Sequence, residues 1–315
     1  MTNIAYLPPP LPRRRRRPQP KFNLRQFLFG FCIGYFGGAI ALSAAFLIVN
    51  SLFPPPRLNV LIIGLDRRPG ESTVARADTL ILATVNPKTS YVGLLSIPRD
   101  LWVTLPDGSQ NRINTAHFFA EAATPGTGPA ATVETVSANF GVSVHKYIRI
   151  DFAGFVRIID SVGGITINIQ EPIIDDHFPT YDYGIQTISF EAGEQHLDGE
   201  RALQYARTRH ASSDFDRAKR QQAVIAAFTR RLLEPGAWLR FPSLFVTILS
   251  AVDTNLTPLE ILRLLPTLIS VGPEGMDRRV IEGDLVLPFT TSGGASVQLP
   301  IWDTINPVLL EMFGE

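Results

Sequence analysis

The segment of residues 207–222, RTRHASSDFDRAKRQQ, concentrates charged side chains where a helix is about to begin. It contains four arginines, one lysine and two aspartates. Arg207 and Arg209 are two positions apart, so in an extended segment both side chains would point to the same side. Two interpretations are open: a solvated surface, or arginines that converge on an anion.

The helix expected over residues 215–233 places further polar groups on one face. Asp214, Arg217 and Gln221 are spaced i, i+3, i+7 and share this face, and Arg220 lies on its flank. Arg217 and Gln221 also fall in the first turns, where unpaired backbone N–H groups favour an anion. Taken alone, the same pattern is typical of a solvated helix with local ion pairs.

Charged residues also stand at the ends of expected strands earlier in the chain, in GLDRR, ARADT, SIPRD and NRINTAH. In chain order they are Asp66, Arg76, Asp78, Arg99, Asp100 and Arg112. Residues that leave the strand ends of an open α/β sheet share a crevice, which is the usual ligand position in such folds. A lone aspartate at a strand end is also a common turn former.

Electrostatics indicates which ligand would suit such a crevice. Two like charges ~4 Å apart repel by about 4 kcal/mol at an effective dielectric constant of ~20, so converging arginines need an anion. A pyrophosphate fits, because guanidinium groups match phosphate oxygens in pairs. Asp66 and Asp78 would repel that anion unless a divalent cation lay between them. The pair therefore predicts a site for Mg2+, with Mn2+ as the alternative ion.

Other function classes lack their motifs. The sequence has no GxSxG, P-loop, HExxH or GxGxxG pattern, and its five histidines are scattered without zinc spacing. Seven of the 29 basic residues lie in residues 1–50, which contain no acidic residue. From Ser51 onward the chain therefore has 22 basic and 29 acidic residues, a net charge of −7. The acidic body does not favour nucleic acid as a partner.

The N-terminal region has the pattern of a membrane anchor. Residues 27–49 contain no charged residue, and as a helix they span about 35 Å, enough for a bilayer core of ~30 Å. The RRRRR run before them predicts a cytoplasmic N-terminus. A cleaved signal peptide is the competing interpretation, but its apolar part is usually ~7–15 residues. We expect a basic cytoplasmic tail (1–26), a transmembrane anchor (27–49), a Pro-rich linker (50–57) and an extracytoplasmic domain (58–315).

Small residues within the expected anchor indicate a route to self-association. Gly30, Gly34 and Gly38 fall on one helical face and permit close packing with a second helix, so a dimer through this ridge is an expectation. The single cysteine, Cys32, lies in the same segment, so the body has no disulfide.

The periodicity of the body predicts an α/β fold. Apolar or alternating runs predict strands at 58–64, 79–85, 90–97, 145–151 and 165–169. The second and third strands flank the turn 86–89 and predict a hairpin in the sheet centre. Helices are expected at 113–123, 132–140, 152–162, 198–203 (capped by Asp198), 215–233 and 258–269, and strand-like pieces at RRVIEG and ASVQLP. The order strand, helix, strand over 145–169 predicts a crossover unit.

Eight motifs in this order resemble the LytR-CpsA-Psr family. They are GLDRR, ARADTLILATVNPKT, LLSIPRDLWV, NRINTAH, IDFAGF, VGGITINI, GEQHLDGERALQYARTR and DFDRAKRQQ, and the resemblance extends over about residues 58–233. The resemblance implies an α/β/α sandwich with a central mixed sheet, preceded by one N-terminal transmembrane helix. It also implies a channel for a lipid tail.

The resemblance assigns roles residue by residue. Asp66 and Asp78 would hold Mg2+ and, with Arg99, form the catalytic set. The pyrophosphate would be bound by Arg76, Arg99, Arg112, Arg207, Arg209, Asp214, Arg217, Arg220 and Gln221, with Asp214 orienting arginines. Two departures are Arg67, where the family often has serine, and Asp216, where it often has glycine.

The implied activity is a membrane-anchored phosphotransferase. It would move a glycopolymer from a polyprenyl (undecaprenyl) pyrophosphate carrier to a peptidoglycan hydroxyl, and polyprenyl phosphate would leave. A carboxylate, Asp66 or Asp78, would help to deprotonate the hydroxyl, although a metal ligand is a poor base. Two alternatives stay open: a polyprenyl-pyrophosphate hydrolase that uses water, and a non-catalytic scaffold that binds lipid or polymer.

Overall fold

The structure is a computed structural model, and it describes residues 24–68, 70–208, 214–238 and 241–314. The expectations for the basic run before the anchor and for Arg209 lie outside the described residues. The chain divides into two compact units, residues 1–52 and 53–315. In the first unit the described part is helix α1 (Leu24–Leu52). Within the described ranges, no helix was found that is both long and apolar enough to cross a membrane.

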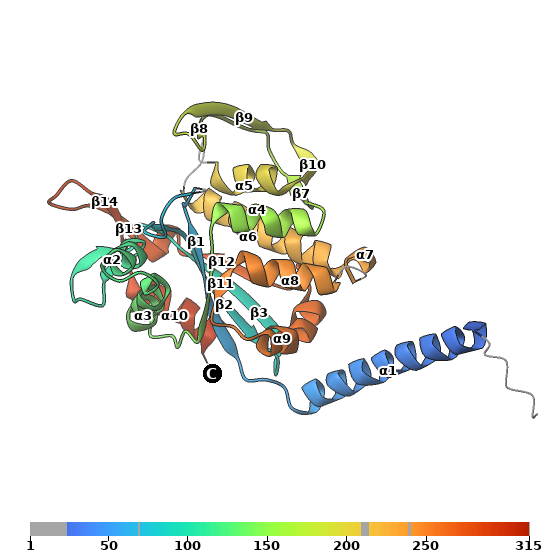
Figure 1. Cartoon of the computed structure of the whole chain (residues 1–315). Coiled ribbons are helices and arrows are strands. Elements are labelled where there is room, and N and C mark those ends of the chain that lie inside the picture. The colour runs from blue at the N-terminus through green and yellow to red at the C-terminus, as the bar shows by residue number, and fades with distance from the viewer. Residues whose placement is uncertain (1–23, 69, 209–213, 239–240, 315) are drawn as a thin grey trace, which may run out of the picture. The chain divides into compact units, whose positions relative to one another are not determined.

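The second unit is built on a mixed six-stranded sheet with the order β11-β6-β1-β2-β3-β12 (Figure 1). Its strands are β1 (Leu58–Leu65), β2 (Ala77–Asn86), β3 (Tyr91–Ile97), β6 (Lys146–Ile150), β11 (Asp253–Thr254) and β12 (Asp277–Val280). The pairs β1–β2, β2–β3 and β6–β11 are antiparallel, whereas β1–β6 and β3–β12 are parallel. The α/β class and the central mixed sheet are as expected from the sequence.

The predicted hairpin at the sheet centre is confirmed as β2–β3. Its strands pair from Leu80↔Ile97 to Asn86↔Tyr91. The Asn86 side chain accepts a hydrogen bond from the Lys88 backbone N–H at 3.2 Å, which fixes the turn.

A glycine is required where β1 approaches β2 most closely. The register between these strands shifts at Gly64/Leu65, just before the chain leaves the sheet. A Cβ added to Gly64 would lie 2.8 Å from the Cβ of Thr79, closer than side chains tolerate. The bulge therefore redirects the residues that follow β1.

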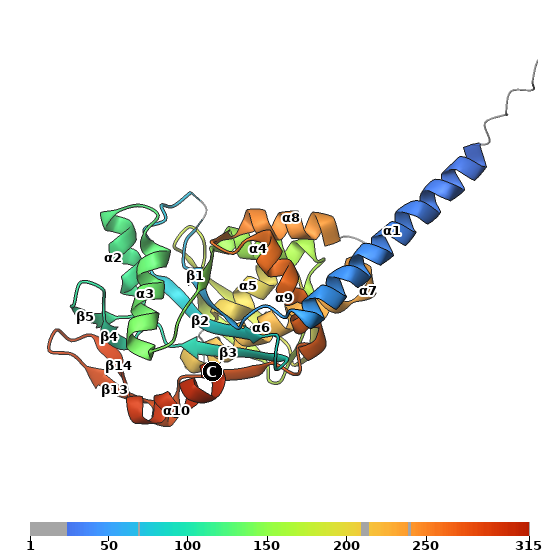
Figure 2. The same ribbon diagram turned by 90° about the horizontal axis from the view of Figure 1, so that it is seen from below.

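Helices cover both faces of the sheet. On one side lie α2 (Thr115–Ala123), α3 (Gly128–Phe140) and α10 (Trp302–Phe313), whose Val136, Phe140 and Leu309 share a buried core with Leu61 and Leu80. On the other side α6 (Asp214–Leu233) and α9 (Pro258–Val271) contact β2 and β3. Figures 1 and 2 show the two groups of helices apart from each other in both views.

A second apolar core includes Val224 and Ala227 of α6 together with residues of four strands and three more helices. These elements are α4 (Phe152–Ser161), β7 (Ile165–Ile169), β8 (Ile173–Pro179), β9 (Ile185–Phe190), β10 (Gly193–Leu197), α5 (Gly199–Arg207) and α8 (Phe241–Ala251). Asp198 caps α5, as expected, and accepts a hydrogen bond from the Arg201 backbone N–H at 2.9 Å.

The predicted crossover unit over residues 145–169 is wrong, although each of its elements is present. β7 pairs with β10 in a separate two-stranded sheet and does not join β6. Gly163 and Gly164 adopt φ angles of 80° and 84° directly after α4, a left-handed conformation that redirects the chain. The isoleucines of β7 are then buried in the second core.

The remaining described elements are short or lie near the C-terminus. They are β4 (Trp102–Thr104), β5 (Gln110–Arg112), α7 (Pro235–Trp238), the 3-10 helix η1 (Gly283–Leu285), β13 (Val286–Thr290) and β14 (Ser296–Pro300). β4 pairs with β5, and β13 pairs with β14. The pieces RRVIEG and ASVQLP thus contain strands β12 and β14, as the sequence predicts.

Candidate functional site

The directions of the strands bring the predicted charges to one edge of the sheet. β1 runs parallel to β6 and antiparallel to β2, which in turn runs antiparallel to β3. The ends of β1, β3 and β6 therefore lie beside the start of β2. Asp66 and Asp151 follow β1 and β6, Asp78 is near the start of β2, and Arg99 comes after β3.

Arg99 links two carboxylates from different elements. Its Nη1 donates to Asp78 Oδ2 at 2.9 Å, and its Nε donates to Asp214 Oδ2 at 3.1 Å. Burial opposes the charged form of Arg99, but Asp78 and Asp214 outweigh it and raise the pKa of the guanidinium. Asp214 also pairs with Arg217 Nη1 at 3.3 Å. Asp214 thus contacts two arginines, Arg99 and Arg217.

Arg217 and Gln221 carry the predicted face of α6 into the site. Arg217 is buried and its Nη2 donates to the backbone carbonyl of Asp78 at 3.4 Å. Gln221 Nε2 donates to Thr79 Oγ1 at 2.9 Å, so α6 contacts two successive residues of β2. Arg220 instead donates to the carbonyl of Thr208 at 2.6 Å and is not among the residues that line the cavities described below.

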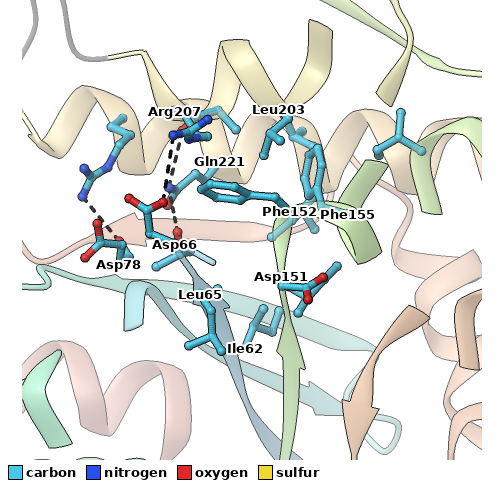
Figure 3. A pocket seen from close by; sticks show the side chains of 18 of the residues that line it. Ile62, Leu65, Asp66, Asp78, Asp151, Phe152, Phe155, Leu203, Arg207 and Gln221 are labelled. Atoms are coloured by element: carbon cyan, nitrogen blue, oxygen red, sulfur yellow. Dashed lines mark hydrogen bonds and ion pairs between the residues drawn. The ribbon is translucent and has the colours of Figure 1, made fainter. Parts of the chain in front are cut away.

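Arg207 approaches the site from α5 and is helical, so the condition of an extended segment does not apply to it. It is the last residue of α5, because the helix continues past the expected end at residue 203. Its Nη2 lies 4.0 Å from Asp66 Oδ1. The guanidinium also stacks over the rings of Phe152 and Phe178, at 4.1 and 5.1 Å from the ring centroids. Figure 3 shows Arg207 above Asp66, with Phe152 beside them.

A large apolar cavity of about 560 Å³ opens on one side of these charges. Side chains from the sheet, α4, α5 and α6 line it, among them Ile62, Ile81, Phe155, Leu203, Val224 and Phe228. At its charged end the lining includes Asp66, Asp78, Arg207, Arg217 and Gln221. Figure 3 labels Asp66, Asp78, Arg207 and Gln221 at this end. The sequence left open which apolar helices line a tunnel. Of the three apolar stretches 113–123, 224–233 and 258–269, the second contributes Val224, Ile225 and Phe228 to the lining, and the other two contribute no residue.

A polar cleft of about 490 Å³ shares the same two aspartates with the apolar cavity. Its lining consists of Asp66, Arg76, Asp78, Arg99, Asp100, Arg112, Asn114 and Ser296. Arg112 donates from Nη2 to the carbonyl of Ser296 at 2.8 Å, which ties β5 to β14 across the cleft. Asp66 and Asp78 are the acidic residues common to the apolar cavity and the polar cleft.

Several residues of the site were not predicted. Arg67 appeared only as a departure from the family pattern, yet its Nη1 pairs with Asp151 Oδ2 at 3.2 Å and joins the ends of β1 and β6. Asp151 had a detectable signal, because it follows an expected strand as Asp66 does. Asp175 and His177 of β8 also line the cavity, and Asp175 accepts a hydrogen bond from Thr208 Oγ1 at 2.7 Å.

The donor atoms at the junction suit Mg2+ better than a softer metal. Mg2+ is usually held by one or two carboxylates together with substrate phosphates and water. Asp66 and Asp78 supply carboxylate oxygens where the cavity and the cleft meet. Among the described residues there is no group of three or more His, Cys, Asp or Glu side chains that could hold a metal ion. The two aspartates therefore fit an ion that shares its coordination with a phosphate.

Fold and site together define an α/β protein in which a cluster of arginines and aspartates joins an apolar cavity to a polar cleft. The chain belongs to the LytR_cpsA_psr family, whose sequence model matches residues 54–301. It is 39% identical over 182 residues to the polyisoprenyl-teichoic acid–peptidoglycan teichoic acid transferase TagU of Oceanobacillus iheyensis, which covers 57% of this chain and 53% of that protein.

A second TagU and a solved structure support the same relationship. TagU of Bacillus subtilis is 34% identical over 202 residues, which is 63% of this chain and 60% of that protein. The chain thus matches between half and two thirds of the length of these relatives. The crystal structure of B. subtilis TagV has a TM-score of 0.66 and 27% sequence identity, and it covers 82% of this chain and 97% of that chain.

Proposed function

We propose that this protein is a phosphotransferase that moves a glycopolymer from a polyprenyl pyrophosphate carrier to peptidoglycan and forms a phosphodiester. The observation that carries the proposal is that Asp66 and Asp78 line both the apolar cavity and the polar cleft. A substrate with a lipid tail, a charged diphosphate and a sugar chain matches this arrangement: the tail suits the apolar cavity, the diphosphate suits the charged residues, and the sugars suit the polar cleft. The similarity to the two TagU proteins, which are polyisoprenyl-teichoic acid–peptidoglycan teichoic acid transferases, supports this substrate class.

The apolar cavity would bind the polyprenyl tail. Its walls of isoleucine, leucine, valine and phenylalanine remove the tail from water, which stabilises binding in proportion to the apolar area buried. The charged end of the cavity would then hold the lipid-side phosphate near Arg207, Arg217 and Gln221. The polar cleft would receive the sugar-side phosphate and the first sugars.

The arginines position the diphosphate and stabilise the charge that develops on its bridging oxygen. Arg99 is held by Asp78 and Asp214, so its guanidinium is oriented before substrate arrives. Arg76 and Arg112 add positive charge along the cleft. When bound between Asp66 and Asp78, Mg2+ would neutralise phosphate charge without a proton transfer. A sugar hydroxyl of peptidoglycan attacks the sugar-side phosphorus, and polyprenyl phosphate leaves.

The proposed reaction is tested with purified full-length protein and a labelled polyprenyl pyrophosphate–linked polymer, with and without peptidoglycan. We expect release of polyprenyl phosphate to depend on the acceptor, with label appearing on peptidoglycan, and to stop when a chelator removes divalent cations. Release that is independent of the acceptor would identify a hydrolase. An Asp78→Ala variant that attaches polymer at the normal rate would identify a non-catalytic scaffold.

The same proposal includes a membrane location. Residues 27–49 would anchor the chain with the N-terminus in the cytoplasm and residues 58–315 outside, where peptidoglycan lies. The glycine ridge of Gly30, Gly34 and Gly38 would permit a dimer within the membrane. Protease added to intact spheroplasts should degrade the body and leave the first 50 residues protected. A body that is protected until the cells are lysed would contradict this orientation.

A further inference from the structure

Asp100 lies in the polar cleft but has no assigned role. It follows Arg99 after the end of β3, and its carbonyl accepts a hydrogen bond from the backbone N–H of Gln298 at 3.1 Å. This bond fixes the main chain of the residue against β14. The side chain shares the lining of the cleft with Asp66 and Asp78.

The carboxylates of Asp66, Asp78 and Asp214 are already engaged with arginines. Asp78 and Asp214 both accept from Arg99, and Asp66 lies opposite Arg207. Within the described ranges, no ion pair and no hydrogen bond from another side chain engages the carboxylate of Asp100. Its lone pairs are therefore open to a group that enters the cleft.

The surroundings of Asp100 suit proton transfer. Burial raises the pKa of its carboxyl, and the negative charge of Asp214 raises it further, while its own backbone N–H, Arg99 and Arg112 act in the opposite direction. Other charged groups that line the same cleft are Asp66, Arg76 and Asp78. A general base is most effective when its pKa lies close to the operating pH, so a raised value favours this role over that of a structural carboxylate.

The position of the cleft relative to the cavity sets the direction of attack. In phosphoryl transfer the attacking and leaving oxygens lie roughly in line on opposite sides of the phosphorus. If the lipid phosphate leaves toward the apolar cavity, the hydroxyl must approach from the polar cleft. Asp100 lines the cleft and is absent from the lining of the cavity, so it stands on the attacking side.

We propose that Asp100 is the general base that deprotonates the acceptor hydroxyl; this inference rests on the proposed function. The hydroxyl oxygen forms a bond to the sugar-side phosphorus while its proton passes to a carboxylate oxygen of Asp100. The bond between that phosphorus and the bridging oxygen breaks, and its electron pair leaves with polyprenyl phosphate. Asp100 then returns the proton to solvent. Asp66 and Asp78, the proposed metal ligands, then do not have to act as the general base, a role for which a metal ligand is poorly suited.

The test compares Asp100→Asn, Asp100→Glu and the matched control Glu134→Gln in full-length protein. Glu134 is exposed on α3, so its change to an amide leaves the cleft intact. Acceptor-dependent transfer is measured from pH 5 to 9, together with the affinity for the labelled polyprenyl pyrophosphate substrate and the thermal unfolding midpoint. We expect Asp100→Asn to lower kcat by about 10²- to 10⁴-fold. The substrate affinity and the unfolding midpoint should stay at the wild-type values.

The pH profile separates a base from a structural residue. The wild-type rate should fall as acid protonates Asp100, and this acid limb should be lost in Asp100→Asn while Asp100→Glu recovers part of the rate. Transfer by Asp100→Asn within about twofold of wild type, or a residual rate with the same acid limb, would overturn the assignment and leave the proposed function intact. If the wild-type protein itself gives no acceptor-dependent transfer, the proposed function fails and the assignment falls with it.

Discussion

Arg99 and Asp78 are joined by an ion pair of 2.9 Å, although Arg99 follows β3, Asp78 lies in β2 and the two are 21 residues apart. The same guanidinium binds Asp214 at the start of α6, at 3.1 Å. One side chain therefore fixes the start of β2 relative to α6, which also carries Arg217 and Gln221. Because the geometry of Arg99 depends on a planar group with several donors, a lysine cannot replace it.

The first prediction concerns Arg99→Lys. The ammonium keeps the charge but cannot bind Asp78 and Asp214 in the same fork, so we expect kcat/KM for polymer transfer to fall by about 10- to 100-fold. The matched control is Arg278→Lys on the exposed surface of β12, which should retain wild-type kinetics. Equal kinetics for Arg99→Lys and wild type would show that the two-carboxylate arrangement is unimportant for the reaction.

The second prediction concerns the length of the lipid tail. Phe228 lines the apolar cavity, and a larger ring in Phe228→Trp would occupy space that the tail needs. KM should rise by about tenfold for a long polyprenyl substrate and stay near the wild-type value for a short-chain analogue. Phe119→Trp on α2 makes the same chemical change at an exposed position outside the cavity lining. An equal effect of Phe228→Trp on both substrates would argue against a tail in this cavity.

The parts of the site that follow from local pattern were predictable from the sequence. Continuous apolar runs identify β1, β2 and β3, and the charged residues at their ends then have to meet at one sheet edge. The i, i+3, i+7 spacing of Asp214, Arg217 and Gln221 depends only on helix geometry. In the structure Asp214 contacts Arg99 and Arg217, and Gln221 contacts Thr79.

The unpredicted parts depend on contacts between distant segments. Arg67 and Asp151 are 84 residues apart, and neither local motif indicates that they pair. The stacking of Arg207 on Phe178 depends on the hairpin β8–β9, whose position no periodic pattern fixes. The pairing of β7 with β10 could not be predicted either, because an apolar strand can be buried in either of the two cores.

The third prediction separates two adjacent glutamines of α6. Gln222 is buried and donates from Nε2 to Ser96 Oγ at 2.9 Å and to the Arg279 carbonyl at 2.7 Å, whereas Gln221 faces the cavity. Gln222→Leu should lower the free energy of unfolding by about 1–3 kcal/mol, because buried partners lose their donor. Gln221→Leu should have a smaller effect on unfolding and should weaken substrate binding. Chemical denaturation and a binding titration on both variants check the prediction, and interchanged effects would contradict it.

The fourth prediction concerns stability in acid and depends on Glu121 of α2. Glu121 is buried, accepts a hydrogen bond from the Gly128 backbone N–H at 2.9 Å and lies 3.4 Å from Arg149 Nη1. Burial alone would raise the pKa of its carboxyl. Hydrogen bonds from Thr73 and from backbone N–H groups, together with the charge of Arg149, nevertheless lower it from 4.5 to about 2.

Because the pKa of Glu121 is lower in the folded protein than in the unfolded chain, its charged form stabilises the fold above pH 4.5. That contribution, on the order of 3 kcal/mol, is lost as the pH falls from 4.5 toward 2. In Glu121→Gln the free energy of unfolding should therefore be lower at pH 7 and should decline less over this interval. Burial also lowers the pKa of His117, which both variants retain, so Glu121→Gln is compared with the matched control Glu134→Gln. If Glu121→Gln and Glu134→Gln gave parallel stability curves between pH 7 and pH 2, the buried carboxylate would have no linkage to folding.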